Sequence, residues 1–172
     1  MRQDPKTIIS AILFKREKGR VKIFLQTRWK PDVSPTYSGM LEIPAGGIDA
    51  YEDVYDALRR EVKEECGLEI VKVVNDYRGP VREPNPHDKA FVFQPFVCQE
   101  VLATNGGLPW IGFVFLCEVA GEIAVNPAEA KDPQWVSIDE LSKIIKIKPG
   151  QIFPLQLPVL EHFIERFPNL SF

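Results

Sequence analysis

Three glutamates lie close together in residues 60–68, which read REVKEECGL. Glu61 and Glu65 are four positions apart, and Glu64 lies between them. In a helix, at about 100° of rotation per residue, Glu61 and Glu65 fall within roughly 20° of Val54, and Glu64 lies on the edge of the same arc. Such a border of carboxylates can bind a divalent cation, because hard cations such as Mg²⁺ take oxygen ligands and share them with substrate phosphates.

A solvated run of charges is the plain alternative for this segment. Glu61 and Glu65 argue against it, since like charges at this spacing destabilise an isolated helix by roughly 0.2–0.5 kcal/mol. Beside an apolar stripe they would also be partly desolvated, and a divalent cation removes that conflict. The same cation can neutralise a diphosphate, orient it, and lower the pKa of a bound water until the water is a usable nucleophile.

The element that must position these acids is a helix that ends near residue 66. Its apolar residues recur at helical spacing: Val54, Ala57, Leu58, Val62 and Cys66. Gly67 stands where a left-handed C-terminal cap belongs. Upstream, a short strand over residues 40–43 leads into residues 44–47 (PAGG), whose small side chains let the backbone approach phosphate and metal closely.

A longer pattern surrounds the acids. Gly46, Glu52 and residues 60–68 stand at the spacing GX5EX7REUXEEXGU, where U is aliphatic, and every fixed position is filled. This segment resembles the Nudix box. One departure is that Tyr51 stands where many members of the family have Gly, which concerns the loop backbone and not a ligand.

The resemblance implies a single domain over residues 1–172 with the Nudix-type α/β/α sandwich and a mixed β-sheet. It implies an enzyme that cleaves the diphosphate linkage of a nucleoside diphosphate joined to another group, X, by water attack and with Mg²⁺ or Mn²⁺ as cofactor. Glu52 and Arg60 would brace the loop against the helix through a charge-assisted hydrogen bond. The metal ligands that the resemblance implies are the Ala45 carbonyl, Glu61, Glu64 and Glu65.

Glu129 lies in the loop NPAE, six positions before Trp135. An exposed loop acid is its plain interpretation. The MutT-type branch of the family carries an acid at the same distance before a Trp-aliphatic strand, where it completes the metal and water site. Because carboxylates that hold cations are poor proton acceptors, a fourth acid from a loop could take the proton of the attacking water.

The residues expected at the substrate are Arg28, Gly46, Gly47 and Gln156. Arg28 ends a predicted strand where the MutT-type branch has a comparable arginine, although a solvated arginine is equally compatible. Residues 44–49 (PAGGID) and Pro84 resemble the ADP-ribose and nucleotide-sugar branch. Residues 153–159 (FPLQLPV) instead resemble the nucleoside-triphosphate branch, where an amide such as Gln156 reads the base. X therefore stays open among these substrate classes.

The rest of the chain is predicted to form strands followed by two helices. The predicted strands cover residues 7–14, 21–28, 69–74, 90–102, 110–119 and 135–136. The predicted helices run from the capping box at Ser137 to about residue 145, and from about Pro158 to Arg166. Two segments with several prolines, residues 77–89 and 127–133, are predicted to be loops.

Composition excludes several classes of function. A net charge of −3 gives no basic stripe for a nucleic-acid polymer, so a small nucleotide is the expected partner. No stretch approaches the ~20 apolar residues of a membrane span, and the chain start does not read as a signal peptide, so a cytoplasmic protein is expected. A homodimer stays open.

Two rival functions remain on the same fold. One is a module that binds nucleotide without turnover; such modules commonly lose glutamates of the box, and all are present here. The other is an isomerase of isopentenyl diphosphate, which needs a Cys and Glu pair facing a small prenyl pocket. Nothing in the sequence places Cys98 or Cys117 in that role.

Overall fold

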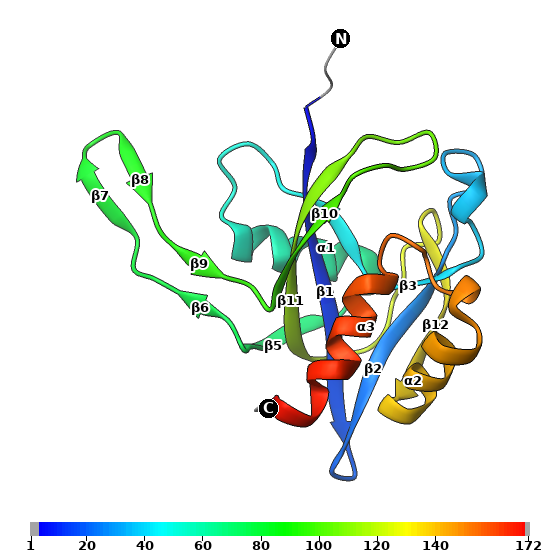
Figure 1. Cartoon of the computed structure of the whole chain (residues 1–172). Coiled ribbons are helices and arrows are strands. Elements are labelled where there is room, and N and C mark those ends of the chain that lie inside the picture. Colours follow the sequence, from blue (N-terminus) through cyan, green and yellow to red (C-terminus); the bar gives the residue numbers. More distant parts are fainter. Residues whose placement is uncertain (1–3, 171–172) are drawn as a thin grey trace.

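The computed structural model describes residues 4–170, and its centre is a mixed β-sheet (Figure 1). The sheet strands are β1 Lys6–Glu17, β2 Arg20–Arg28, β3 Leu41–Glu42, β4 Ala45–Gly47, β5 Glu69–Val74, β10 Val97–Val101, β11 Trp110–Ala120 and β12 Ala130–Ser137. The main path runs β10-β11-β1-β2-β12, and β3, β4 and β5 pair with β2, β1 and β11. β1 is parallel to β11 and antiparallel to β2, so the predicted mixed sheet is confirmed.

Helices cover both faces of the sheet (Figure 1). The α-helices are α1 Val54–Cys66, α2 Ile138–Ile147 and α3 Leu157–Arg166, and short 3₁₀ helices cover Pro35–Tyr37, Pro149–Gln151 and Phe167–Asn169. Along β1 the side chains alternate: Ile12 and Phe14 join the core under α2 and α3, whereas Ile9 and Leu13 join the core under α1. This alternation produces the α/β/α sandwich that the family resemblance implies.

The ends of α1 and α2 follow their capping residues. The side chain of Asp53 accepts a hydrogen bond from the Tyr55 N–H and begins α1. Gly67 ends α1 in the left-handed region with φ of 71°, as its position after the apolar stripe predicts. Ser137 and Glu140 form the predicted capping box of α2. Sequence chemistry therefore fixes where the acid-bearing helix begins and ends.

The prediction of a loop over residues 77–89 is wrong. Within residues 77–94 the structure has β6 Tyr77–Arg78 paired with β9 Phe93–Gln94, and β7 Arg82–Asn85 paired with β8 Asp88–Ala90. We call residues 77–94 the arm, because they stand out from the body as a two-stranded extension (Figure 1). Pro84 fits in β7 because both edges of a free two-stranded ribbon face solvent, where a missing N–H costs little.

Two other predicted boundaries also fail at prolines. The long strand expected over residues 90–102 is interrupted at Pro95, which cannot donate to the sheet and separates β9 from β10. Conversely, β12 begins at Ala130, inside the expected loop, and contains Pro133. There the register shifts between Lys131 and Gln134, and β12 lies at the end of the sheet path, so the proline is tolerated.

None of the helices within residues 4–170 combines the length and the apolar character that crossing a bilayer requires.

Candidate active site

Glu65 is turned into the interior by α1 and is only 6% exposed. One of its carboxylate oxygens accepts hydrogen bonds from the side-chain amide of Gln26 at 3.1 Å and from the backbone N–H of Ala45 at 3.3 Å. Burial, reinforced by the nearby charge of Glu42, raises the pKa of Glu65 to about 8. Glu65 therefore has neutral hydrogen-bond donors but no paired cation.

Glu61 lies directly against the backbone of Gly46. A Cβ atom at Gly46 would fall 1.9 Å from the Glu61 carboxyl carbon, so a larger residue there would displace the Glu61 side chain. Burial raises the pKa of Glu61, while Arg60, which donates to the carboxylate at 2.6 Å, opposes that rise. The glycine loop thus brings backbone and carboxylate into the contact that a metal and phosphate site needs.

Arg60 forms the pair with Glu52 that the sequence predicts. Its Nε and Nη2 atoms each donate to a Glu52 oxygen at 2.8 Å, and Nη2 also donates to the carbonyl of Gly47 at 3.0 Å. We call Glu52, Arg60 and Gly47 the brace. Hydrogen bonds from Arg60 and then from the Asp49 N–H lower the pKa of Glu52 to about 2.

Glu64 does not point inward with the other two glutamates of the helix. Its side chain is 60% exposed, and its carboxylate lies 3.5 Å from Nη1 of Arg60. Arg60 therefore reaches Glu61 and Glu64 as well as Glu52. The helical geometry that places Glu64 at the edge of the apolar stripe also leaves it accessible to solvent.

A buried acid that the sequence analysis did not identify lies on β3. Glu42 is buried beside Gln26 of β2, its partner in the strand register. Burial raises the pKa of Glu42, and Arg28, which donates to it at 3.0 Å, offsets part of the rise. The guanidinium carbon of Arg28 also lies over the ring of Phe153, 5.0 Å from its centroid. The signal was a lone charged residue inside the apolar run MLEIP.

Glu129 is tied to the end of β2. Its backbone carbonyl accepts from the Trp29 N–H at 2.7 Å, and its carboxylate accepts from Lys30 Nζ at 2.5 Å. The charge of Glu129 also contributes to the raised pKa values of Glu61 and Glu65. Lys30 is a second residue that the sequence analysis missed. We call the four acids that influence one another the acid cluster: Glu42, Glu61, Glu65 and Glu129.

Gln156 is 2% exposed, and both ends of its amide are occupied. The amide oxygen accepts from the Ile43 N–H at 2.8 Å, and the amide nitrogen donates to the Ile43 carbonyl at 2.9 Å. This geometry opposes the expectation that Gln156 reads the base, because the amide is buried and its hydrogen bonds go to the backbone of Ile43. Gln156 instead fixes the backbone just before the glycine loop.

The acid cluster suits a divalent cation in charge and in atom type. Burial raises the pKa values of Glu42, Glu61 and Glu65, and repulsion from neighbouring acids adds to the rise for Glu61 and Glu65. Hard oxygens are what Mg²⁺ and Mn²⁺ prefer. Within residues 4–170 no three acidic, His or Cys side chains are already gathered as a cage. Glu61 is held by Arg60 and Glu64 faces solvent, so binding would reorient these side chains.

Comparisons with known proteins agree with this geometry. A family model described as NUDIX domain matches residues 5–157. An RNA pyrophosphohydrolase of Bartonella clarridgeiae is 29% identical over 117 residues, which are 63% of this chain and 62% of the relative. One of Campylobacter jejuni is 27% identical over 146 residues, covering 84% and 83%. The chain thus spans less than two thirds of the Bartonella relative.

A solved structure supports the fold. It is described as a possible asymmetric diadenosine tetraphosphate hydrolase of Jonesia denitrificans, with a TM-score of 0.67, 16% identity and 99% of each chain covered. At that identity the likeness concerns the architecture alone. The domain match, in contrast, includes both the glycine loop and the whole of α1. The chain therefore belongs to the NUDIX domain family.

Proposed function

We propose that this protein hydrolyses the diphosphate linkage of a nucleoside diphosphate joined to X, with Mg²⁺ or Mn²⁺ as cofactor. The observation that carries the proposal is the buried and poorly compensated Glu65, held within hydrogen-bond reach of the glycine loop. The relatives named pyrophosphohydrolases support a hydrolase of phosphoric anhydride bonds.

Glu61, Glu64, Glu65 and the carbonyl of Ala45 would hold the cation. A bound cation supplies charge neutralisation of the diphosphate and a water of lowered pKa. Burial, and then repulsion from neighbouring acids, raises the pKa values of Glu61 and Glu65, and a bound cation would counteract both effects. The cation that hydrolysis requires would therefore also stabilise the charged form of the carboxylates that bind it.

The chain itself contributes position and proton transfer. Gly47 leaves room for phosphate oxygens beside the backbone, Gly46 lets the Glu61 carboxylate approach the loop, and the brace fixes that loop to α1. Glu129 is the proposed proton acceptor for the attacking water. Its partly exposed side chain pairs with Lys30 just after β2, and its charge contributes to the raised pKa values of Glu61 and Glu65.

The substrate class includes nucleoside triphosphates, ADP-ribose and nucleotide sugars. The composition predicts that no nucleic-acid polymer is a partner. Two relatives are nevertheless named RNA pyrophosphohydrolases, so we add a 5′-triphosphorylated RNA end to the candidate substrates. Attack at a phosphorus of the diphosphate bridge is common to all of them. The proposed function thus specifies the bond that is cleaved and leaves the identity of X open.

A panel assay tests the proposal. Purified protein is incubated with ADP-ribose, UDP-glucose, deoxynucleoside triphosphates, diadenosine tetraphosphate and a 5′-triphosphorylated RNA, with Mg²⁺, with Mn²⁺ and with EDTA. The expected result is metal-dependent release of a nucleotide or diphosphate from at least one substrate, lost in Glu65→Gln. Tight nucleotide binding with no turnover of any substrate would favour the sensing module instead.

A further inference from the structure

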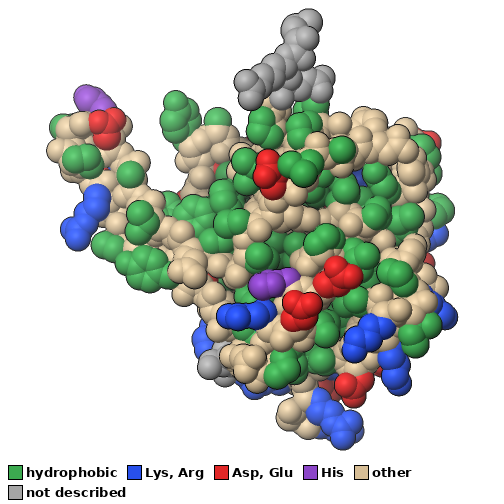
Figure 2. Space-filling view, in the orientation of Figure 1, with side chains coloured by type: hydrophobic (Ala, Val, Ile, Leu, Met, Phe, Trp, Pro, Cys, Tyr) green, Lys and Arg blue, Asp and Glu red, His purple; other side chains and the backbone are tan. Residues whose placement is uncertain are grey.

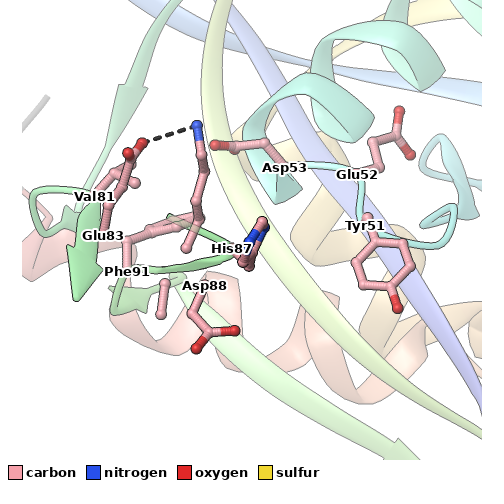
Figure 3. A pocket seen from close by; sticks show the side chains of 10 residues that line it. Tyr51, Glu52, Asp53, Val81, Glu83, His87, Asp88 and Phe91 are labelled. Atoms are coloured by element: carbon pink, nitrogen blue, oxygen red, sulfur yellow. Dashed lines mark ion pairs between the residues drawn. The ribbon is translucent and has the colours of Figure 1, made fainter. Parts of the chain in front are cut away.

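A cavity of about 970 Å³ separates the arm from the loop that precedes α1. Figure 2 shows the hollow between the arm and the body, and Figure 3 shows Tyr51 on the body side opposite Val81, His87 and Phe91 of the arm. The cavity lies outside the acid cluster but shares a wall with the brace, because Glu52 lines it. Arg60 donates hydrogen bonds to both Glu52 and Glu61, so the two sites are neighbours.

Tyr51 occupies this wall in a strained conformation. Its φ is 66°, in the left-handed region that favours glycine, and its side chain is fully exposed. A bulky residue is costly in that region and gains nothing here from burial. Strain of this kind persists where the surrounding structure imposes it, and it clusters at sites that bind ligands. The exposed ring is therefore the feature that requires an explanation.

Three of the carboxylates around the cavity are ion-paired, and a fourth, Asp88, accepts a hydrogen bond from the side-chain amide of Asn85. Glu52 is held by Arg60, Asp53 lies 2.6 Å from Arg78, and Glu83 lies 2.8 Å from Lys89. No unpaired cation is left on these walls to attract a phosphate. The walls instead offer the ring of Tyr51, the partly buried ring of Phe91 and the carboxylates as hydrogen-bond acceptors. This combination suits an uncharged planar group that carries N–H or O–H donors.

We propose that the cavity binds the nucleoside end of X, with its base stacked on Tyr51, while the diphosphate lies at the acid cluster. The proposal rests on the proposed function and narrows it: X is itself a nucleoside, as in a dinucleoside polyphosphate. A 5′-triphosphorylated RNA also carries a second nucleoside, but that nucleoside is joined through the 3′ oxygen of the first one and not across the diphosphate. A base that stacks on one aromatic ring is sequence-tolerant, so the cavity selects for a second nucleoside more than for a particular base.

The replacement Tyr51→Gly separates the ring from the strain. Glycine removes the stacking surface and relaxes the backbone, so a ring without function would leave activity intact and stability equal or higher. Lys18→Gly is the matched control, because Lys18 has φ of 50° in the distant β1–β2 turn. Tyr51→Phe keeps the stacking ring and should retain the wild-type Kd for diadenosine tetraphosphate. His87→Ala probes the opposite wall.

KM values and equilibrium Kd values are measured for diadenosine tetraphosphate, for ATP and for a 5′-triphosphorylated dinucleotide RNA. In Tyr51→Gly, KM and Kd for diadenosine tetraphosphate should rise about tenfold or more, as expected for one lost stacked base, while those for ATP and the thermal midpoint stay unchanged. If KM and Kd for the RNA rise as well, the cavity accepts the second nucleoside of both the dinucleoside polyphosphate and the RNA.

Equal effects on ATP and on diadenosine tetraphosphate, or no effect on either, would overturn the proposal. If the wild type binds diadenosine tetraphosphate but turns over no substrate of the whole panel, the proposed function fails. The cavity is then still judged by the Kd ratio of Tyr51→Gly to wild type. A wild type that binds diadenosine tetraphosphate no more tightly than ATP would also contradict a nucleoside site in the cavity.

Discussion

The brace and the acid cluster hold the same residue type in opposite electrostatic situations. In the brace, two hydrogen bonds from Arg60 lower the pKa of Glu52 to about 2. In the acid cluster, burial raises the pKa of Glu65 to about 8, although the two carboxylates are only thirteen positions apart in sequence. A bidentate cation partner satisfies the first carboxylate, whereas neutral amide donors leave the second without compensation.

The brace is electrostatically satisfied without a ligand, whereas the acid cluster is not. The brace needs no ligand, because every charge in it has a partner. In the acid cluster, Glu42, Glu129 and Glu61 pair with Arg28, Lys30 and Arg60, but Glu65 has only neutral donors, so a cation would complete the cluster. The brace is therefore assigned to geometry and the cluster to chemistry, and substitutions on the two sides should fail in different ways.

Glu65→Gln should have the largest effect on activity. The amide keeps the shape and can still accept from Gln26, but it loses the charge that a cation needs, so turnover should fall by several orders of magnitude. Circular dichroism should show an intact fold, because an uncompensated buried acid has been removed. Glu69→Gln, at an exposed residue paired with Lys63, is the control. Near-normal turnover at saturating Mg²⁺ would remove Glu65 from the site.

Glu129→Gln should lower kcat by ~10²–10⁴, with little change in KM, if Glu129 accepts the proton of the attacking water. The variant should also flatten the acid limb of the pH–rate profile. Lys30→Gln breaks the same ion pair from the other side and is the matched comparison. Equal losses of kcat in the two variants would mean that the pair matters and that Glu129 is not the base.

Arg60→Ala should lower kcat by about 10²-fold through misplacement of the loop. Mg²⁺ affinity should be retained, because the acid cluster keeps its carboxylates. Hydrogen exchange at the amides of residues 47–53 should become faster, since Arg60 no longer ties Glu52 and the Gly47 carbonyl to α1. Arg59→Ala, at an exposed neighbour paired with Asp56, is the control. Lost metal binding with unchanged loop protection would contradict the brace.

The acid cluster and the brace should make the stability of the metal-free protein depend on pH in opposite directions. Glu65 keeps its proton in the folded state between its ordinary pKa of 4.5 and about 8, so stability should fall as pH rises through that window and level off above it. Glu52 contributes stability above its ordinary pKa of 4.5, and that contribution should be lost as pH falls towards about 2. Thermal unfolding of wild type and Glu65→Gln tests the first slope, which the variant should lack.

The box and its helix could be predicted because local chemistry determines them. The apolar spacing, Asp53 and Gly67 place α1, and the spacing of Glu52 and Arg60 makes their pairing a short-range event. The alternation along β1 and the capping box at Ser137 likewise carry their structure in neighbouring residues.

The parts that escaped prediction depend on contacts between distant segments. Glu42 joins the cluster only because β3 pairs with β2, and Gln156 is taken from the substrate by the backbone of Ile43, 113 positions away. The prolines of residues 77–89 indicate a loop, but Pro84 is tolerated in β7 because the edges of this two-stranded ribbon face solvent. Pairing across the fold, not local preference, decides such cases.

The most direct test of the account is the count of protons released when Mg²⁺ binds near pH 7. Glu65 should hold its proton there, and metal binding requires the carboxylate, so calorimetry in buffers of different ionisation enthalpy should show about one proton released per site. Glu65→Gln should release none. Mg²⁺ binding to the wild type with no proton release, or with equal release in the variant, would contradict the claim that Glu65 is the unsatisfied acid that the cation completes.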